Sequence, residues 1–149
     1  MWIVIRTDIT IMGLDQFAYR IKTGLINEDV DFSTEKYNEK TEDYDVVVEK
    51  EEIHYWRKHG AMQGWMQELY HSKGGEDPEF NCVNVKVDVE DLLELQRDVK
   101  NGSLTSHFQG GFFFGEDKSD DMKDDDLDFI SKALESYDNG YEIYYSSWW

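Results

Sequence analysis

The segment from residue 80 to residue 102 constrains the fold most, because it places a strand pattern directly before a helix pattern. Four valines alternate with polar residues between positions 83 and 89, which predicts a half-buried strand. Phe80 and Cys82 lie one residue out of phase with these valines, as at a β-bulge. Asp88 has the residue type of a helix N-cap, and Asn101-Gly102 is a typical helix stop. The segment therefore predicts a strand followed at once by a short amphipathic helix that buries Leu92, Leu93, Gln96 and Val99.

The C-terminal third continues this mixture of elements. Residues 103–109 are predicted as loop, and residues 110–115 as a compact aromatic strand bracketed by glycines. The acidic stretch 116–126 leads into a helix, since carboxylates are favourable at the positive end of the helix dipole. After a turn at residues 138–140, residues 141–148 predict a closing strand. The expected buried face of the last helix comprises Leu127, Ile130, Leu134 and Tyr137.

The N-terminal half has less regular patterns. Residues 2–5 and residues 44–49 each predict a strand. Apolar residues at helical spacing predict a short helix over Asp15–Lys22, closed by Gly24. The polar residues 27–41 are predicted as loop, with an edge strand as the alternative.

A longer helix is predicted over residues 51–70, before a break at residues 73–78 that contains the only proline. Gly60 and Gly64 lie four residues apart on the flank of this helix, where missing side chains permit close approach of another element. A plain loss of helix propensity is the alternative explanation. The apolar arc of the helix comprises Tyr55, Met62, Trp65, Met66, Leu69 and Tyr70.

Strands and helices mix without the regular rhythm of βαβ units. The sequence therefore predicts an α+β fold, with a mostly antiparallel sheet packed with about three helices. The length of 149 residues is near the commonest domain size, so residues 1–149 are expected to form a single acidic domain. The net charge of −18 alone would suggest disorder, but 40% hydrophobic and 15% aromatic residues favour a folded core.

Two features of the sequence indicate the cellular compartment in which the protein is found. No apolar run reaches the roughly 20 residues of a membrane span, and the first residues lack the pattern of a secretory signal. Cys82 is the only cysteine, so no intramolecular disulfide can form, which fits a reducing compartment. We therefore expect a cytoplasmic protein with no membrane partner, in which Cys82 is a buried thiol.

Residues that carry chemistry are sparse. Three histidines between residues 54 and 71 lack the spacing of a zinc site. The glycines of residues 110–115 lack the ending of a phosphate loop, and the acids of residues 120–128 lack the glycine and glutamate of a calcium loop. We therefore predict a non-enzymatic protein with no catalytic residue, metal or cofactor. The alternative is an enzyme whose residues are dispersed along the chain, such as Arg57, His59, Glu68 and His107.

Acidic residues concentrate in two segments. Residues 28–52 hold 11 acids and three lysines, and residues 116–128 hold eight acids and two lysines. Because phosphate contacts need Lys and Arg, this balance argues against direct nucleic-acid binding and predicts a basic protein partner. The alternative is that the charge only maintains solubility.

Three motifs in the chain resemble a widespread group of small bacteriophage-encoded proteins. They are Ile-His-Tyr-Trp-Arg-Lys-His at residues 53–59 followed by Trp65-Met66, Gly-Phe-Phe-Phe-Gly at residues 111–115, and Tyr-Ser-Ser-Trp at residues 145–148. In the group a histidine often precedes the second tryptophan, where this chain has Gln63-Gly64. The group has no agreed activity, so the resemblance implies a bacteriophage origin and assigns no catalytic residue. Because phages commonly encode small acidic proteins that block host nucleases, CRISPR effectors or restriction enzymes, it also implies a counter-defence role.

The expected function is therefore an anti-CRISPR-like or anti-restriction-like inhibitor in the host cytoplasm. It would bind a basic host protein, such as a CRISPR effector or another nuclease, through an acidic surface that either mimics nucleic acid or simply occludes a groove. The alternative is an interaction module that uses the surface of residues 55–58 and the terminal tryptophans, with Arg57 and Trp149 as secondary contacts. The sequence leaves open whether the protein forms a homodimer. The expected partner-binding residues are Glu42, Asp43, Glu49, Glu51, Glu52, Glu116, Asp117, Asp120, Asp121, Asp124, Asp125 and Asp126.

Overall fold

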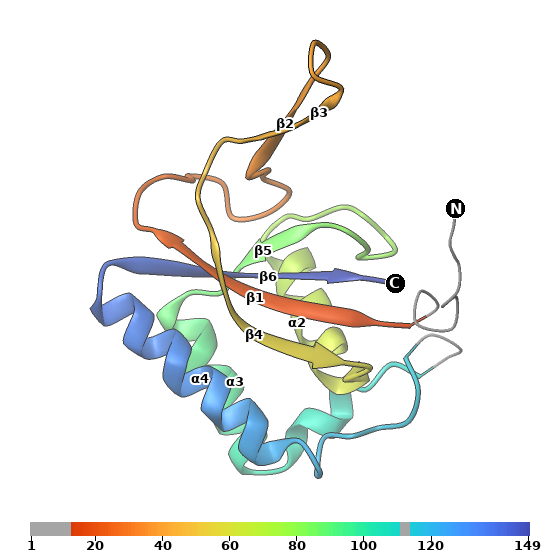
Figure 1. Cartoon of the computed structure of the whole chain (residues 1–149). Coiled ribbons are helices and arrows are strands. Elements are labelled where there is room, and N and C mark those ends of the chain that lie inside the picture. The colour runs from red at the N-terminus through yellow and green to blue at the C-terminus, as the bar shows by residue number, and fades with distance from the viewer. Residues whose placement is uncertain (1–12, 111–113) are drawn as a thin grey trace.

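The computed structural model describes residues 13–110 and 114–149, in which three helices cover one face of a four-stranded sheet (Figure 1). The strand order is β4-β1-β6-β5, and every neighbouring pair is antiparallel. Strands β2 and β3 form a separate hairpin. The predicted α+β class, with a mostly antiparallel sheet and about three helices, is confirmed. The elements are β1 (Asp15–Lys22), β2 (Glu35–Asn38), β3 (Asp43–Val46), β4 (Glu51–Arg57), α2 (Gly60–Ser72), β5 (Asn84–Lys86), α3 (Val89–Lys100), the 3₁₀ helix η2 (Ser103–His107), α4 (Lys123–Asp138) and β6 (Tyr141–Trp148).

Strand β1 lies between β4 and β6, so the helix predicted over Asp15–Lys22 is wrong. Gln16 and Ala18 are fully buried beneath the helices, while the rings of Phe17 and Tyr19 stack on the opposite face, 5.9 Å apart. Apolar residues three and four apart fit a strand with two covered faces as well as they fit a helix. Pairing with two neighbouring strands decides between these alternatives, because it satisfies the backbone groups on both edges of β1.

Strand β4 occupies the start of the helix predicted over residues 51–70, so only the later part of that prediction is confirmed, as α2. Within β4, His54 and Trp56 are buried and Tyr55 is exposed, which is the alternation of a strand. Lys58 then adopts a positive φ of 55°, and α2 begins two residues later. The prediction joined a strand and a helix into one helix, because aromatic residues occur in both without a clear break between them.

The glycines of α2 allow the 3₁₀ helix η2 to pack against it. A Cβ atom on Gly64 would lie 1.7 Å from the carbonyl oxygen of His107, and one on Gly60 would lie 2.7 Å from the carbonyl oxygen of Gln109. Both distances are far below van der Waals contact, so only glycine fits at these positions. Close approach of another element is therefore confirmed, and the predicted loop at residues 103–109 contains this short helix.

The strand predicted over residues 80–89 shortens to the three residues of β5. Phe80 and Cys82 have positive φ angles of 49° and 61°, so the chain turns at these positions before the strand begins. The predicted buried thiol is also wrong, because the Cys82 residue is exposed.

Helix α3 begins and ends as predicted, behind Asp88 and before Asn101. The backbone N–H of Asp88 donates to the Asp91 carboxylate at 2.8 Å, which closes the first turn. The predicted buried stripe is partly wrong, since Leu93 is 50% exposed and Leu95 is fully buried in its place.

Helix α4 and strand β6 also lie where the sequence predicts them, but α4 is rotated about its axis. Ile130 is buried as expected, whereas the other three predicted core residues of α4 are only half-buried. Phe129 is fully buried instead and packs edge-on against Trp56, with ring centroids 4.7 Å apart. The predicted turn is confirmed at Gly140, which has a φ of 87°.

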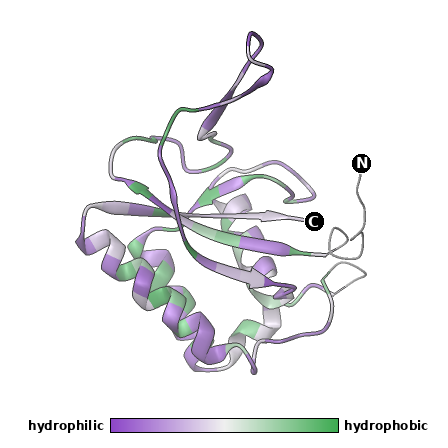
Figure 2. Cartoon of the chain, in the orientation of Figure 1, coloured by the Kyte–Doolittle hydropathy of each residue, from purple (hydrophilic) through white to green (hydrophobic). Residues whose placement is uncertain are grey.

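Two cores stabilise the body, one on each face of the sheet. The larger lies between the sheet and the helices, and the smaller joins Ile21 and Tyr144 to Ile26 and Phe32 on the other face. Figure 2 shows that hydrophobic residues lie mainly in the body and that the hairpin is largely hydrophilic. No helix in the described ranges is long and apolar enough to cross a membrane. The strand predicted at residues 2–5 lies outside the described ranges. So do residues 111–113 of the aromatic strand predicted at residues 110–115.

Candidate functional site

The β2–β3 hairpin projects from the body as an arm, which we define as residues 35–46 (Figure 1). Its two strands pair with each other and with no other described strand. At the base of the arm, the carbonyl oxygen of Thr34 accepts hydrogen bonds from the backbone N–H groups of Val47 and Val48, at 2.9 and 3.1 Å. The chain therefore leaves and re-enters the body at one fixed point.

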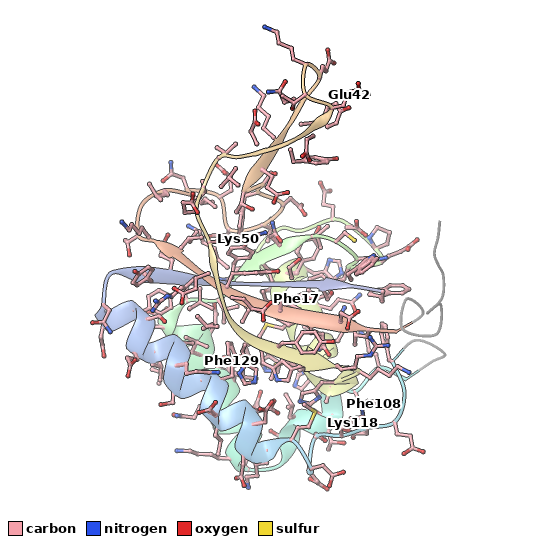
Figure 3. The ribbon with its side chains drawn as sticks, viewed as in Figure 1. Phe17, Glu42, Lys50, Phe108, Lys118 and Phe129 are labelled. Atoms are coloured by element: carbon pink, nitrogen blue, oxygen red, sulfur yellow. The ribbon has the colours of Figure 1, made fainter. Side chains whose placement is uncertain are left out.

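The acidic residues of the arm are all exposed, and so are Glu49, Glu51 and Glu52, which follow it. Figure 3 shows Glu42 at the tip of the arm, where the positive φ of 56° at this residue closes the hairpin. Asp45 accepts a hydrogen bond from Asn38 across the hairpin at 2.9 Å, and Glu51 pairs with Arg20 at 2.6 Å. The predicted residues Glu42, Asp43, Glu49, Glu51 and Glu52 therefore all lie where a partner can reach them.

The arm also carries apolar side chains that the body does not cover. Tyr37 and Tyr44 face each other across the hairpin with ring centroids 5.3 Å apart, yet they are 50% and 61% exposed. Val46 and Val47 at its base are 61% and 60% exposed. A two-stranded hairpin without a packed face is only marginally stable by itself, and grouped exposed apolar residues mark interaction sites. The arm therefore combines negative charge with an uncovered apolar side.

The second acidic segment, residues 116–128, lies far from the arm: Figure 3 shows Lys118 near the end of the molecule opposite Glu42. Burial raises the pKa of Asp117, but hydrogen bonds from Ser119 and Thr105 outweigh this effect and hold the pKa below its ordinary value. Asp125 contacts the buried imidazole of His54 at 2.9 Å. Asp128 pairs with Lys132 within α4 at 3.4 Å, and the carboxylates of Glu116, Asp120, Asp121 and Asp124 are exposed and form no hydrogen bond or ion pair with a side chain of the described residues.

Asp126 is fully buried, so its prediction as a partner contact is wrong. Its two carboxylate oxygens accept hydrogen bonds from the indole N–H of Trp56 at 3.0 Å and from Nε2 of His59 at 2.8 Å. A buried carboxylate is tolerated only when such donors compensate for lost water. The spacing contained a signal for this, because Asp126 lies four residues before Ile130 and so belongs to the apolar stripe of α4.

His59 fixes the start of α2 through both its backbone and its ring. Gln16 donates to the His59 carbonyl at 3.0 Å and accepts from its backbone N–H at 2.8 Å. Among the described residues, Nδ1 of His59 has no hydrogen-bond partner, and the side chain is fully buried. Because no solvent reaches this ring, its geometry favours a structural role over catalysis.

A second polar network, missed in the sequence, continues from Gln16 through the core. Gln16 donates to the Tyr145 hydroxyl at 2.9 Å, and this hydroxyl donates to Gln63 at 2.5 Å. Gln63 in turn donates to Ser147 at 2.9 Å. Burial raises the pKa of Tyr145, so the hydroxyl keeps the proton that this network uses. Gln63 lies among apolar residues of α2, which is the only signal that the sequence offers for the network.

The face of the sheet opposite the helices offers a second surface. Tyr55 packs on Phe17 with ring centroids 5.3 Å apart and is 45% exposed, and Arg57 pairs with Asp15 at 2.9 Å. Of the two terminal tryptophans, Trp148 is the more exposed. The backbone N–H of the half-buried Trp149 donates to Asn81 at 3.0 Å, which ties this secondary candidate to the body.

The dispersed catalytic set is only partly brought together. Glu68 and Nδ1 of His107 contact each other at a cavity between α2, α3 and η2. Arg57 and His59 do not line this cavity. Although the Cys82 residue is exposed, its thiol is partly shielded from water, and this shielding together with the charge of Asp77 raises the pKa of the thiol, which lowers its reactivity. No group of three or more His, Cys, Asp or Glu in residues 13–110 and 114–149 is arranged to hold a metal ion.

Comparison with protein-family models, with curated proteins and with solved structures found no match to this chain. The likeness to the bacteriophage group therefore stays a prediction from the three sequence motifs.

Proposed function

We propose that this protein is a non-enzymatic inhibitor that binds a basic, nucleic-acid-handling protein, with the arm as its principal contact. In keeping with the sequence resemblance, the partner would be a host CRISPR effector or another nuclease, and the role would be phage counter-defence. The observation that carries the proposal is the arm itself, which projects from the body with every carboxylate exposed and with Tyr37 and Tyr44 uncovered.

The arm supports occlusion of a groove better than broad mimicry of a duplex. The arm lies far from the second acidic segment, and that segment uses four of its eight carboxylates for contacts within the chain. A narrow acidic hairpin can enter a groove that is lined by Lys and Arg, where its charge attracts the partner and its tyrosines supply apolar contact area. Binding of this kind would compete with nucleic acid for the same basic groove.

The test is capture of partners from a bacterial lysate at low and physiological salt, with identification by mass spectrometry. The arm variant Glu42→Lys/Asp43→Lys/Asp45→Lys is compared with the matched variant Glu116→Lys/Asp120→Lys/Asp121→Lys, which changes the net charge equally. We expect the arm variant to lose a basic nucleic-acid-binding protein that the wild type and the matched variant retain. The captured protein should also lose affinity for a labelled DNA duplex, measured by fluorescence anisotropy, when the wild type is added.

Two outcomes would contradict the proposal. Equal loss of capture in both variants would indicate a general charge effect, because the two variants differ only in where the charge lies. Retention of all captured proteins by the arm variant would show that the arm makes no essential contact.

The exposed aromatic residues favour a second candidate, an interaction module that uses the open face of the sheet. Tyr55 and Trp148 are 45% and 52% exposed on this face, and aromatic residues are typical of binding hot spots. The double variant Tyr55→Ala/Trp148→Ala distinguishes the candidates in the same capture experiment. Loss of the partner in this variant, with retention in the arm variant, would favour the sheet face.

A further inference from the structure

A solvent-open cavity of about 260 Å³ lies between α2, α3 and η2, and neither proposed binding surface includes it. The volume is slightly below the range of about 300–1,000 Å³ that is usual for drug-sized ligands, so it suits a single side chain. Its main lining residues are Trp65, Glu68 and Leu69 from α2, Glu94 and Asp98 from α3, and His107 from η2.

Contacts between the three elements fix the walls of this cavity. Gly64 lets the backbone at His107 approach α2, since any Cβ there would collide with the His107 carbonyl oxygen. The indole N–H of Trp65, a residue only 5% exposed, donates to Asp98 at 2.9 Å, and Ser103 donates to the other Asp98 oxygen at 3.2 Å. Asp98 is therefore held in one orientation with its side chain only 16% exposed.

The cavity has an excess of negative charge that its lining does not balance. Three carboxylates line it, and among residues 13–110 and 114–149 no lysine or arginine is part of its lining. His107 contacts Glu68 through Nδ1, and its Nε2 lies 3.9 Å from Asp98, so one imidazole is shared between two of the acids. Arg97 approaches Asp98 at 3.9 Å, but its side chain is 66% exposed and outside the cavity. Glu94 makes no hydrogen bond or ion pair with any described residue.

We propose that this cavity binds the guanidinium group of an arginine side chain from another protein. A carboxylate has about four acceptor sites, so Asp98 and Glu68 can accept further hydrogen bonds beyond those from Trp65 and His107. A planar guanidinium with five donors can reach carboxylates on α2 and α3 at once, which an ammonium group does less well. Leu69 and the edge of Trp65 provide apolar surface for the aliphatic stem. The proposal does not depend on the arm.

The test is titration of the wild-type protein with N-acetyl-arginine amide, followed through the Trp65 indole N–H signal in a ¹⁵N–¹H correlation spectrum. The chain has five tryptophans, and the variant Trp65→Phe assigns the signal. We expect a saturable shift with millimolar affinity, as one side chain allows. The matching citrulline amide, which has the same shape without the charge, should cause no saturable shift, and the lysine amide should bind more weakly than the arginine amide.

Single substitutions locate the binding. Glu94→Gln should weaken the arginine amide about fivefold, as loss of one partly exposed ion pair implies. Glu90→Gln, on the same helix but outside the cavity, should change it less than about twofold. The arm variant should bind the arginine amide like the wild type, so this result is separate from the test of the proposed function. Equal responses to the arginine and citrulline amides, no shift at Trp65, or unchanged affinity in Glu94→Gln would each overturn the proposal.

Discussion

In the arm every acidic side chain is exposed, whereas in residues 116–128 Asp126 is fully buried, Asp125 contacts a buried histidine and Asp117 accepts hydrogen bonds. The two segments have similar compositions, and their charge alone would assign them the same role. The difference follows from where each segment packs. Among the described strands, those of the arm pair only with each other, while α4 places its first turn against β4 and the start of α2. Asp117, Asp125 and Asp126 therefore contribute to stability, whereas the carboxylates of the arm stay exposed.

The largest expected effect is at Asp126. Asp126→Ala removes the acceptor for both Trp56 and His59 and leaves two buried polar groups unpaired, so we expect a loss of about 3–5 kcal/mol in the free energy of unfolding. Urea unfolding followed by tryptophan fluorescence measures this loss. The control is Asp128→Ala, an exposed site on the same helix, which should change stability by less than about 0.5 kcal/mol. Similar values for both variants would remove the contrast between the two acidic segments.

A smaller loss is expected at Asp125, whose carboxylate contacts His54 at 2.9 Å but is itself 46% exposed. Asp125→Ala should cost about 1 kcal/mol more than Asp124→Ala, because both remove a charge from the first turn of α4 and only one removes the hydrogen bond to His54. Chemical unfolding of the two variants under the same conditions gives the difference. Equal losses would mean that the His54 contact contributes nothing beyond the helix-dipole effect.

Removal of the arm should affect stability less. Because Val47 and Val48 both donate to Thr34, a two-glycine link in place of residues 35–46 can close the gap without moving the body. We expect the free energy of unfolding to change by less than about 1 kcal/mol, since within the described part of the chain the two strands of the arm pair only with each other. Thermal unfolding checks this, and a cooperative transition near the wild-type temperature would be expected. A large drop would show that the arm stabilises the body.

The smallest effect is a pH dependence at Asp117. Its pKa in the folded protein is below the ordinary 3.8, so its contribution to stability is present above pH 3.8 and is lost as the pH falls through the folded-state value. Asp117→Asn should therefore lower the unfolding temperature slightly at pH 6 and leave it unchanged well below pH 3. Paired thermal scans at the two pH values measure the difference. A constant difference at both values would show that ionisation of Asp117 is not involved.

Several elements were predictable because local chemistry specifies them. Asp88 and Asn101-Gly102 set the ends of α3, and Asn139-Gly140 sets the turn before β6. The spacing of Gly60 and Gly64 also indicated a close approach, although it gave no indication that η2 would be the neighbour. In contrast, β1 and β4 were predicted as helix, because apolar positions three and four apart fit both a helix and a strand covered on two faces.

The candidate site was predictable only in part. The acidic residues from 42 to 52 are exposed as expected, since carboxylates are almost never fully buried unless they are paired. The contacts of Glu68 with His107 and of Asp126 with His59 join residues 39 and 67 positions apart, and no local spacing predicts such pairs. The resemblance to a bacteriophage group and the inhibitor function remain predictions that the capture experiment tests.

The sequence by itself determined the α+β class, the two acidic segments and the helices with clear caps, because propensity, capping and charge act over a few neighbouring residues. Only the tertiary structure decided that β1 is a strand between two others, that Asp126 is buried and that the arm stands clear of the body. The physical reason is that burial and strand pairing depend on which distant segments lie alongside. Identical carboxylates therefore stabilise the fold in one place and stay exposed in another.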